Sequence, residues 1–114
     1  MQPSGTPSDF NEALGDSIEE TMITLLSREV VDALYAHLRA VYSIQRDEVP
    51  RELETFFSTL ERTFGVPSTK TISRAITRTF YAKLGLTFPH NPNRTLLECV
   101  QEAKTKLQEG EIQL

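Results

Sequence analysis

Apolar residues recur every three or four positions along most of this chain, and this spacing constrains the fold more than any other feature. The clearest example is the run of Leu53, Phe56, Phe57, Leu60 and Phe64. Such spacing places side chains on one face of an α-helix. No segment shows the strict alternation of apolar and polar residues that is typical of a half-buried strand. The sequence therefore predicts an all-α fold.

Residues that favour helix starts and stops divide the chain into a compact bundle of four to five helices. Serine and threonine accept hydrogen bonds from the N–H groups of a first helical turn, and proline fits there because its missing N–H is not needed. Glycine ends helices because it adopts positive φ without steric cost. The expected starts after the first helix are Ser27, Pro50, Ser68 and Thr95, and the expected stops are Gly65, Gly85 and Gly110. Residues 44–49 and 86–93 are expected to be loops, and residues 66–67 a short connector.

The first helical segment allows two interpretations. Phe10, Leu14, Ile18, Met22, Leu25 and Leu26 recur at helical spacing across it. Gly15 interrupts this pattern and costs about 1 kcal/mol relative to alanine in a helix interior. Ser17 and Glu20 have the spacing of a capping box, which marks a helix start. Residues 8–26 therefore form either one helix or two short ones.

The chain has 114 residues, which is enough for one domain. Residues 1–7 contain two prolines and a glycine among polar residues and are expected to be a disordered tail. Residues 8–110 are expected to form a single helical domain. We expect one core that contains Leu34, Leu38, Phe56, Phe57, Leu60, Ile72, Ile76, Phe80, Leu96, Val100 and Leu107.

Several protein classes are excluded by what the sequence lacks. No run approaches the roughly 20 apolar residues that span a bilayer, and the first residues do not resemble a secretory signal. Cys99 is the only cysteine, so no intrachain disulfide can form. These features predict a cytoplasmic protein that does not bind a membrane.

No motif indicates catalysis, a cofactor or a metal. His37 and His90 lie 53 residues apart without matching cysteine or carboxylate partners, so both are interpreted as ordinary surface or core-edge histidines. Cys99 lies beside Leu96 and Ala103 on the last predicted helix, where a small buried hydrophobe is expected. Phosphate-binding loops, zinc-ligand spacings and local catalytic triads are absent from the sequence. We therefore expect a protein that is not an enzyme and carries no cofactor.

Charge is unevenly distributed along the chain. Residues 62–97 contain six basic residues and no acidic one, a net charge of +6, whereas the remainder contains six basic and 16 acidic residues, a net charge of −10. Lys70, Arg74 and Arg78 recur every four residues and are expected to face away from the core, which makes them candidate partner-binding residues. Alternatively, this basic helix pairs with acidic helices of the same fold.

The segment 64–76 resembles the helix-turn-helix of bacterial repressors. In that motif a Gly-Val turn separates two helices, and a run like Thr-Val-Ser-Arg opens the helix that enters the major groove. By this resemblance the base-contacting residues are Ser68, Thr69, Lys70, Ser73 and Arg74, with Arg78 on phosphate. The spacing from Gly65 to Ile72 is one residue longer than in the repressors. The alternative is two consecutive helices, with Gly65 as a C-cap and Ser68 as an N-cap.

A second resemblance covers residues 25–107. The stretches 81–88, 47–50, 64–65 and 102–107 resemble small helical proteins of the Nitrosopumilus output domain type, which occur in archaea and are proposed signalling outputs. The resemblance implies an all-α fold and a non-enzymatic role, and it assigns no functional residue. The family pattern is more acidic in the fourth helix, where this chain has Lys70, Arg74 and Arg78.

Taken together, these patterns predict a non-enzymatic interaction domain of a signalling or regulatory kind that binds another protein. The alternative is a helix-turn-helix transcriptional regulator that binds DNA through the basic helix at residues 68–84.

Overall fold

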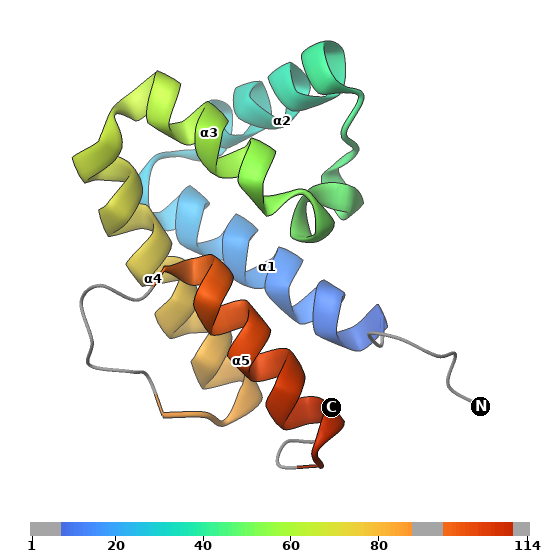
Figure 1. Cartoon of the computed structure of the whole chain (residues 1–114). Helices are drawn as coiled ribbons and strands as arrows, with labels where there is room; N and C mark the ends of the chain where they lie inside the picture. Colours follow the sequence, from blue (N-terminus) through green and yellow to red (C-terminus); the bar gives the residue numbers. More distant parts are fainter. Residues whose placement is uncertain (1–7, 88–94, 111–114) are drawn as a thin grey trace.

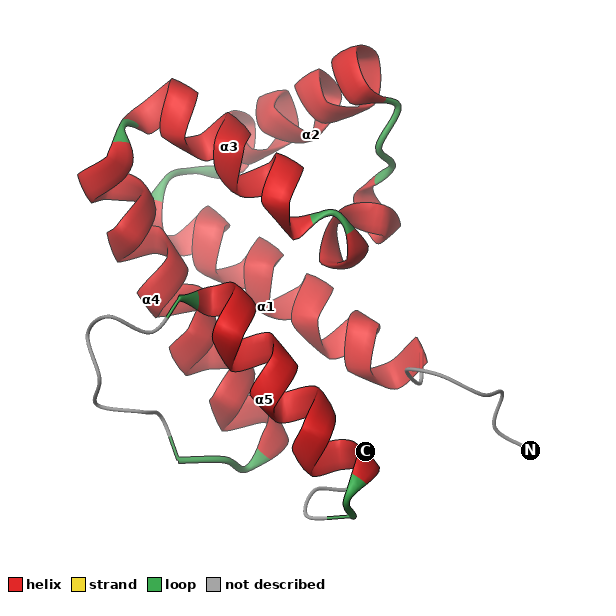
Figure 2. Ribbon diagram, in the orientation of Figure 1, coloured by secondary structure: helices red, strands yellow, loops and turns green. Residues whose placement is uncertain are grey.

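The computed structural model describes residues 8–87 and 95–110 of the chain (Figure 1). Within these ranges it contains five α-helices, one 3-10 helix and no strand (Figure 2), which confirms the predicted all-α fold. The helices are α1 (Ser8–Leu25), α2 (Arg28–Tyr42), η1 (Arg46–Arg51), α3 (Leu53–Phe64), α4 (Val66–Leu84) and α5 (Leu96–Gln108). In the described part of the chain, no helix is long and apolar enough to cross a membrane. The predictions for residues 1–7, for His90 and for most of the expected loop at residues 86–93 lie outside the described residues.

Helix α1 is the centre of the bundle. It runs through the middle of the molecule, with α2, η1 and α3 on one side and α5 with most of α4 on the other (Figure 1). It contacts α2, η1 and α4, while α4 also contacts α3 and α5. The apolar face of α1 is fully buried and consists of Phe10, Leu14, Ile18 and Met22. The ring of Phe10 packs edge-to-face on that of Phe80, with centroids 5.3 Å apart.

A buried tyrosine joins the last two long helices. Tyr81 lies on α4, is 1% exposed, and donates a hydrogen bond from its hydroxyl to the carbonyl oxygen of Cys99 on α5, at 3.0 Å. A buried phenol normally needs such a partner because an unpaired hydroxyl is costly to remove from water. This contact therefore fixes the position of α5 against α4.

The choice between one and two helices at residues 8–26 is settled in favour of one. Helix α1 continues through Gly15 to Leu25. Ser17 does not cap a new helix: its side chain is buried, and its hydroxyl donates to the carbonyl oxygen of Ala13 one turn earlier, at 2.8 Å. Such a bond satisfies a buried serine inside a helix. Gly15 is placed where η1 approaches, since a Cβ atom built on it would lie 3.4 Å from Cγ of Pro50.

The tight contact between Gly15 and Pro50 predicts opposite effects for small and large substitutions. Gly15→Ala should raise the free energy of unfolding by up to about 1 kcal/mol, because alanine favours the helix and its Cβ just fits. Gly15→Leu should lower it by about 1–3 kcal/mol, because the larger side chain displaces η1. Urea denaturation of both variants measures the difference. A leucine variant as stable as the alanine variant would contradict the packing of η1 on α1.

The segment 44–51 differs from its prediction. It is not a loop that ends at the start of a third helix. Instead, Pro50 lies inside η1, and α3 begins at Leu53. The carboxylate of Glu48 accepts a hydrogen bond from the backbone N–H of Gln45 at 2.7 Å, which closes the first turn of η1. Val49 and Pro50 are buried, so this turn is held by its packing on α1.

The junction between α3 and α4 is also shorter than predicted. Gly65 has positive φ as expected, at 87°, but its ψ of 163° is extended rather than left-handed helical. Helix α4 begins directly at Val66, so the expected connector at residues 66–67 is absent and Ser68 is not an N-cap. Gly65 therefore turns the chain alone, in a backbone region that essentially only glycine adopts.

Three other predicted helix boundaries and most of the predicted core are confirmed. Ser27 caps α2, Thr95 and Glu98 form a capping box on α5, and Gly85 ends α4 in the left-handed conformation. Two residues of the predicted core differ from their predicted burial: Phe57 and Leu107 are only partly buried, at its edge.

Candidate interaction surfaces

Lys70, Arg74 and Arg78, which we call the basic stripe, are less exposed than their spacing predicts. Lys70 and Arg78 are exposed, but Arg74 is partly buried. Arg74 lies two turns before Tyr81 on α4 and within about 20° of it around the helix axis. Because Tyr81 packs on α5, Arg74 borders that interface. Arg74 and Arg78 each have an interaction partner within the chain.

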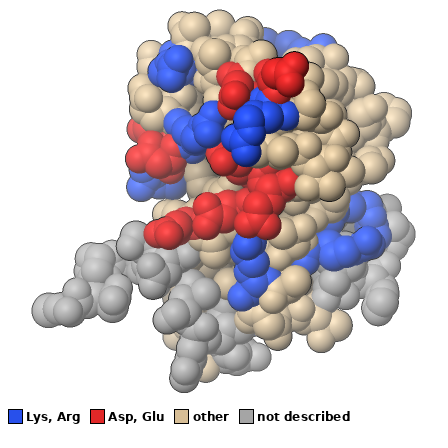
Figure 3. Space-filling view, turned by 180° about the vertical axis from the view of Figure 1, so that it is seen from behind, with Lys and Arg blue, Asp and Glu red and all other residues tan. Residues whose placement is uncertain are grey.

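Helix α4 also pairs with the acidic side of α1. Lys83 forms an ion pair with Glu20 at 2.8 Å, and the hydroxyl of Thr21 donates to that of Thr79 at 3.1 Å. On the face shown in Figure 3, acidic and basic side chains lie next to one another rather than in separate regions. These contacts favour the interpretation that the basic segment partly serves charge matching within the fold. Partner binding by Lys70, Arg74 and Arg78 stays a prediction.

The segment that resembles a helix-turn-helix differs from that motif in its geometry. A helix-turn-helix has a turn of three or four residues, whereas Gly65 alone separates α3 from α4. Thr69, one of the predicted base-contacting residues, is 4% exposed, and its hydroxyl donates to the carbonyl oxygen of Gly65 at 2.9 Å. It therefore cannot reach a base edge in this structure. Ser68 and Lys70 are exposed, and Ser73 is partly buried.

His37 and Cys99 have the surroundings that the sequence predicts. His37 is exposed on α2, and its ring meets that of Tyr42 edge-to-face at 6.2 Å. Cys99 is buried in the core. Across residues 8–87 and 95–110, no group of three or more histidine, cysteine, aspartate or glutamate side chains is placed to hold a metal ion.

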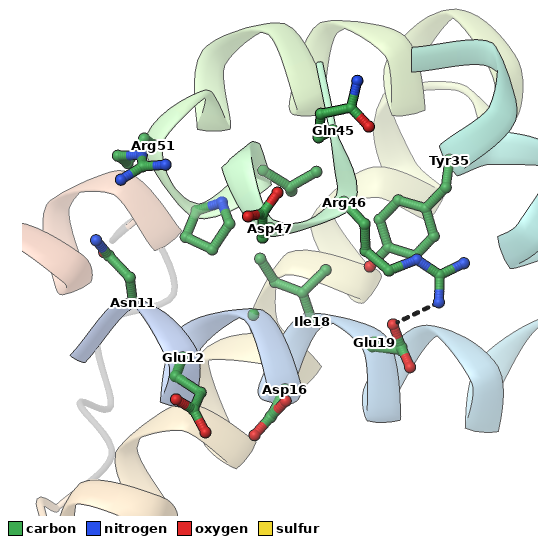
Figure 4. Close-up of a pocket in the computed structure, with 13 residues that line it drawn as sticks. Asn11, Glu12, Asp16, Ile18, Glu19, Tyr35, Gln45, Arg46, Asp47 and Arg51 are labelled. Carbon is green, nitrogen blue, oxygen red and sulfur yellow. Dashed lines mark hydrogen bonds and ion pairs between the residues drawn. The ribbon is translucent and has the colours of Figure 1, made fainter. Parts of the chain in front are cut away.

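One cluster of charges joins three helices. The guanidinium of Arg46 on η1 contacts Glu19 of α1 at 3.1 Å and Asp32 of α2 at 3.2 Å. It also lies over the ring of Tyr35 at 4.3 Å from the centroid, a cation–π contact (Figure 4). Sequence reasoning missed this cluster, because Arg46 lies 14 residues from Asp32 and 27 residues from Glu19 in the chain and no local pattern connects them.

A shallow groove of about 740 Å³ lies between α1 and η1, beside the Arg46 cluster (Figure 4). Ile18, Val49 and Pro50 form its apolar floor, and charged residues surround it. Tyr35 lines it and is only 6% exposed. Burial raises the pKa of the Tyr35 phenol to about 12, with a further rise from Glu19 and an opposing effect of Arg46. Of the two arginines that line the groove, Arg46 is held by two carboxylates.

The most distinctive surface is an exposed apolar face of α2. We define the α2 outer face as Val30, Ala33, His37, Ala40 and Val41, all of which are exposed. Val30 is 40% and Val41 57% exposed. The opposite side of α2 is buried in the core through Val31, Leu34, Tyr35 and Leu38. Helix α2 thus carries a second group of mostly apolar residues that the bundle leaves uncovered, next to the exposed charged residues Glu29, Asp32 and Arg39.

The spacing on this face is that of a helix-packing seam. Val30, Ala33, His37 and Ala40 follow at intervals of three, four and three, the a and d positions of a heptad. Of these residues, sequence reasoning considered only His37. The heptad interval was the signal that was available in the sequence.

Comparison with known proteins adds no relative to this description. No family model matches the chain, and neither a curated protein nor a solved structure is significantly similar to it. The resemblance to the Nitrosopumilus output domain family therefore stays a prediction.

Proposed function

We propose that this protein is a non-enzymatic interaction domain, of a regulatory or signalling kind, that binds a helix of a protein partner through the α2 outer face. The observation that carries the proposal is the exposure of Val30 and Val41 at the two ends of the α2 outer face, whose other residues continue the heptad spacing that starts at Val30. A helix of a small domain normally keeps a polar side toward water. Here the α2 outer face itself carries no charged residue, and the exposed charged residues of α2 (Arg28, Glu29, Asp32 and Arg39) lie beside it.

The physical reason for binding is the apolar area that a partner would remove from water. Val30 and Val41 are already partly covered, so completing their burial contributes on the order of 1 kcal/mol each. The three alanines on this side of α2, at 33, 36 and 40, allow a second helix to approach closely, which brings more atoms into van der Waals contact. These terms favour a modest, reversible interaction.

The other candidate surfaces are less available to a partner. Arg74 and Arg78 of the basic stripe already have partners, and Arg46 beside the groove is held by Glu19 and Asp32. A new ligand that bound any of these three arginines would have to displace these contacts. The α2 outer face requires no such exchange.

The test is affinity purification of the full chain from its native cell, with a charge placed on the seam. Ala33→Glu and Ala40→Glu should each abolish capture of the proteins that the wild-type chain retains, because a buried unpaired carboxylate is costly. Glutamate favours helices nearly as well as alanine, so α2 should persist, which circular dichroism can check. Ala82→Glu, at an exposed site on α4, is the matched control and should behave as wild type.

Nuclease treatment separates this proposal from the DNA-binding alternative. Capture by the α2 outer face should survive nuclease. If instead the chain retains only nucleic acid, and binding is lost in Arg78→Glu but not in Ala33→Glu, the alternative is correct. DNA binding would also weaken steeply with salt, with a slope near −0.9 per neutralised phosphate.

A further inference from the structure

We infer that the α2 outer face binds a second copy of the same chain, with the two α2 helices antiparallel. This inference rests on the proposed function and names the partner. Its basis is that the face is complementary to itself in one register. In this register the helices run in opposite directions, and the numbers of two residues in contact sum to about 70. Val30 then meets Ala40 of the second copy, and Ala33 meets His37.

Each layer of this arrangement combines one large and one small side chain. In two of the four layers, Val30 of one copy meets Ala40 of the other and Ala33 meets His37. The two-fold axis generates the other two layers, in which the same pairs form with the copies exchanged. Alternation of large and small residues lets facing helices interdigitate at the density of a protein interior. A two-fold axis makes every favourable contact occur twice, which is the usual construction of a homodimer.

The parallel arrangement of the same two helices fits less well. It would place His37 against His37, Ala33 against Ala33 and Ala40 against Ala40, so that one layer is crowded while two are left open. It would also bring two copies of Glu29, a charged residue beside the face, next to each other. In the antiparallel register these carboxylates are offset by about 12 residues, roughly 18 Å along the helix.

The size of the face limits the strength of the dimer. From residue 30 to residue 41 the seam is about 16 Å long, and one helix contacts another over a strip about 10 Å wide. This footprint is well below the roughly 800 Å² per partner of a standard stable interface. The expected dimer is therefore transient and exists only at high protein concentration.

Sedimentation velocity of the full chain over about 10 µM to 1 mM tests the association. The wild type and Ala82→Glu should change from monomer to dimer over this range, whereas Ala33→Glu and Ala40→Glu should each shift the midpoint at least tenfold higher. A wild type that is monomeric at 1 mM overturns the inference. If Ala33→Glu still abolishes capture of other proteins, the proposed function survives that outcome. A dimer that both glutamate variants leave unchanged overturns the assignment to α2.

Disulfide trapping tests the register. The native Cys99 is buried, so cysteines introduced on the surface report alone. A mixture of Val30→Cys and Ala40→Cys proteins, distinguished by mass and oxidised near 1 mM, should give mainly the mixed disulfide. An Ala82→Cys protein added to the same mixture measures how much disulfide forms by random collision. If Val30→Cys instead pairs mainly with itself, the helices are parallel and the proposed register is wrong.

Discussion

Phe56→Ala is expected to lower the free energy of unfolding by about 3–5 kcal/mol, the usual cost of truncating a fully buried aromatic residue. Phe56 is 1% exposed and contributes to the core from α3. The adjacent Phe57 is only partly buried, with its ring centroid 5.3 Å from that of Phe56. Part of its surface stays in water in the folded state, so Phe57→Ala should cost clearly less. A single domain has about 5–15 kcal/mol in total, so the Phe56 variant should be close to unfolding.

Urea denaturation followed by circular dichroism measures both variants under the same conditions. The expected order is wild type, then Phe57→Ala, then Phe56→Ala, with unchanged slopes against urea concentration. Phe56→Leu is a useful control because it keeps much of the volume and should be milder than the alanine variant. If the two alanine variants lose equal stability, the orientation of α3 in the structure is wrong.

Alkaline pH should destabilise the protein through Tyr35. An unfolded tyrosine ionises near pH 10, whereas burial raises the pKa of Tyr35 to about 12 in the folded state. Between these pH values the unfolded chain releases the proton while the folded protein keeps it. Ionisation therefore stabilises the unfolded state, and folding stability falls as pH rises. The loss attributable to this residue is about 1.4 kcal/mol at pH 11 and about 2 kcal/mol at pH 12.

Tyr35→Phe isolates this effect from the titration of lysines and other groups. Among the described residues the Tyr35 hydroxyl has no hydrogen-bond partner, so the substitution should be nearly neutral at pH 7. Above pH 10 the variant should become progressively more stable than the wild type, by the amounts given above. If the difference in unfolding free energy between the two proteins stays constant from pH 7 to pH 12, burial does not raise the pKa of Tyr35 to this extent.

Local sequence was sufficient for the helices and for most of their ends. The cap at Ser27, the capping box of Thr95 and Glu98, and the stop at Gly85 all form as predicted. These features depend on hydrogen bonds and backbone angles within a few residues, so the neighbouring sequence contains all the information that they need. The spacing of Phe10, Leu14, Ile18 and Met22 likewise marked a face that is buried in full.

Features that depend on contacts between distant residues were not predicted. Gly15 left open whether residues 8–26 form one helix or two, whereas in the structure it allows Pro50 to approach from 35 positions away in the chain. Residues 44–49 were predicted to be a loop and Pro50 to start a helix, but Arg46–Arg51 form a 3-10 helix that packs on α1. The contacts of Arg46 with Glu19 and Asp32 likewise exist only once α1, α2 and η1 are assembled.

The candidate site shows the same division between sequence and tertiary structure. The sequence determined that Val30, Ala33, His37 and Ala40 share one side of α2, because helical geometry fixes which residues lie together. Only the tertiary structure decided that this side faces solvent while Leu34 and Leu38 face the core. Periodicity groups residues into faces, but burial of a face requires a neighbouring helix, and the position of that neighbour is set by packing across the whole chain.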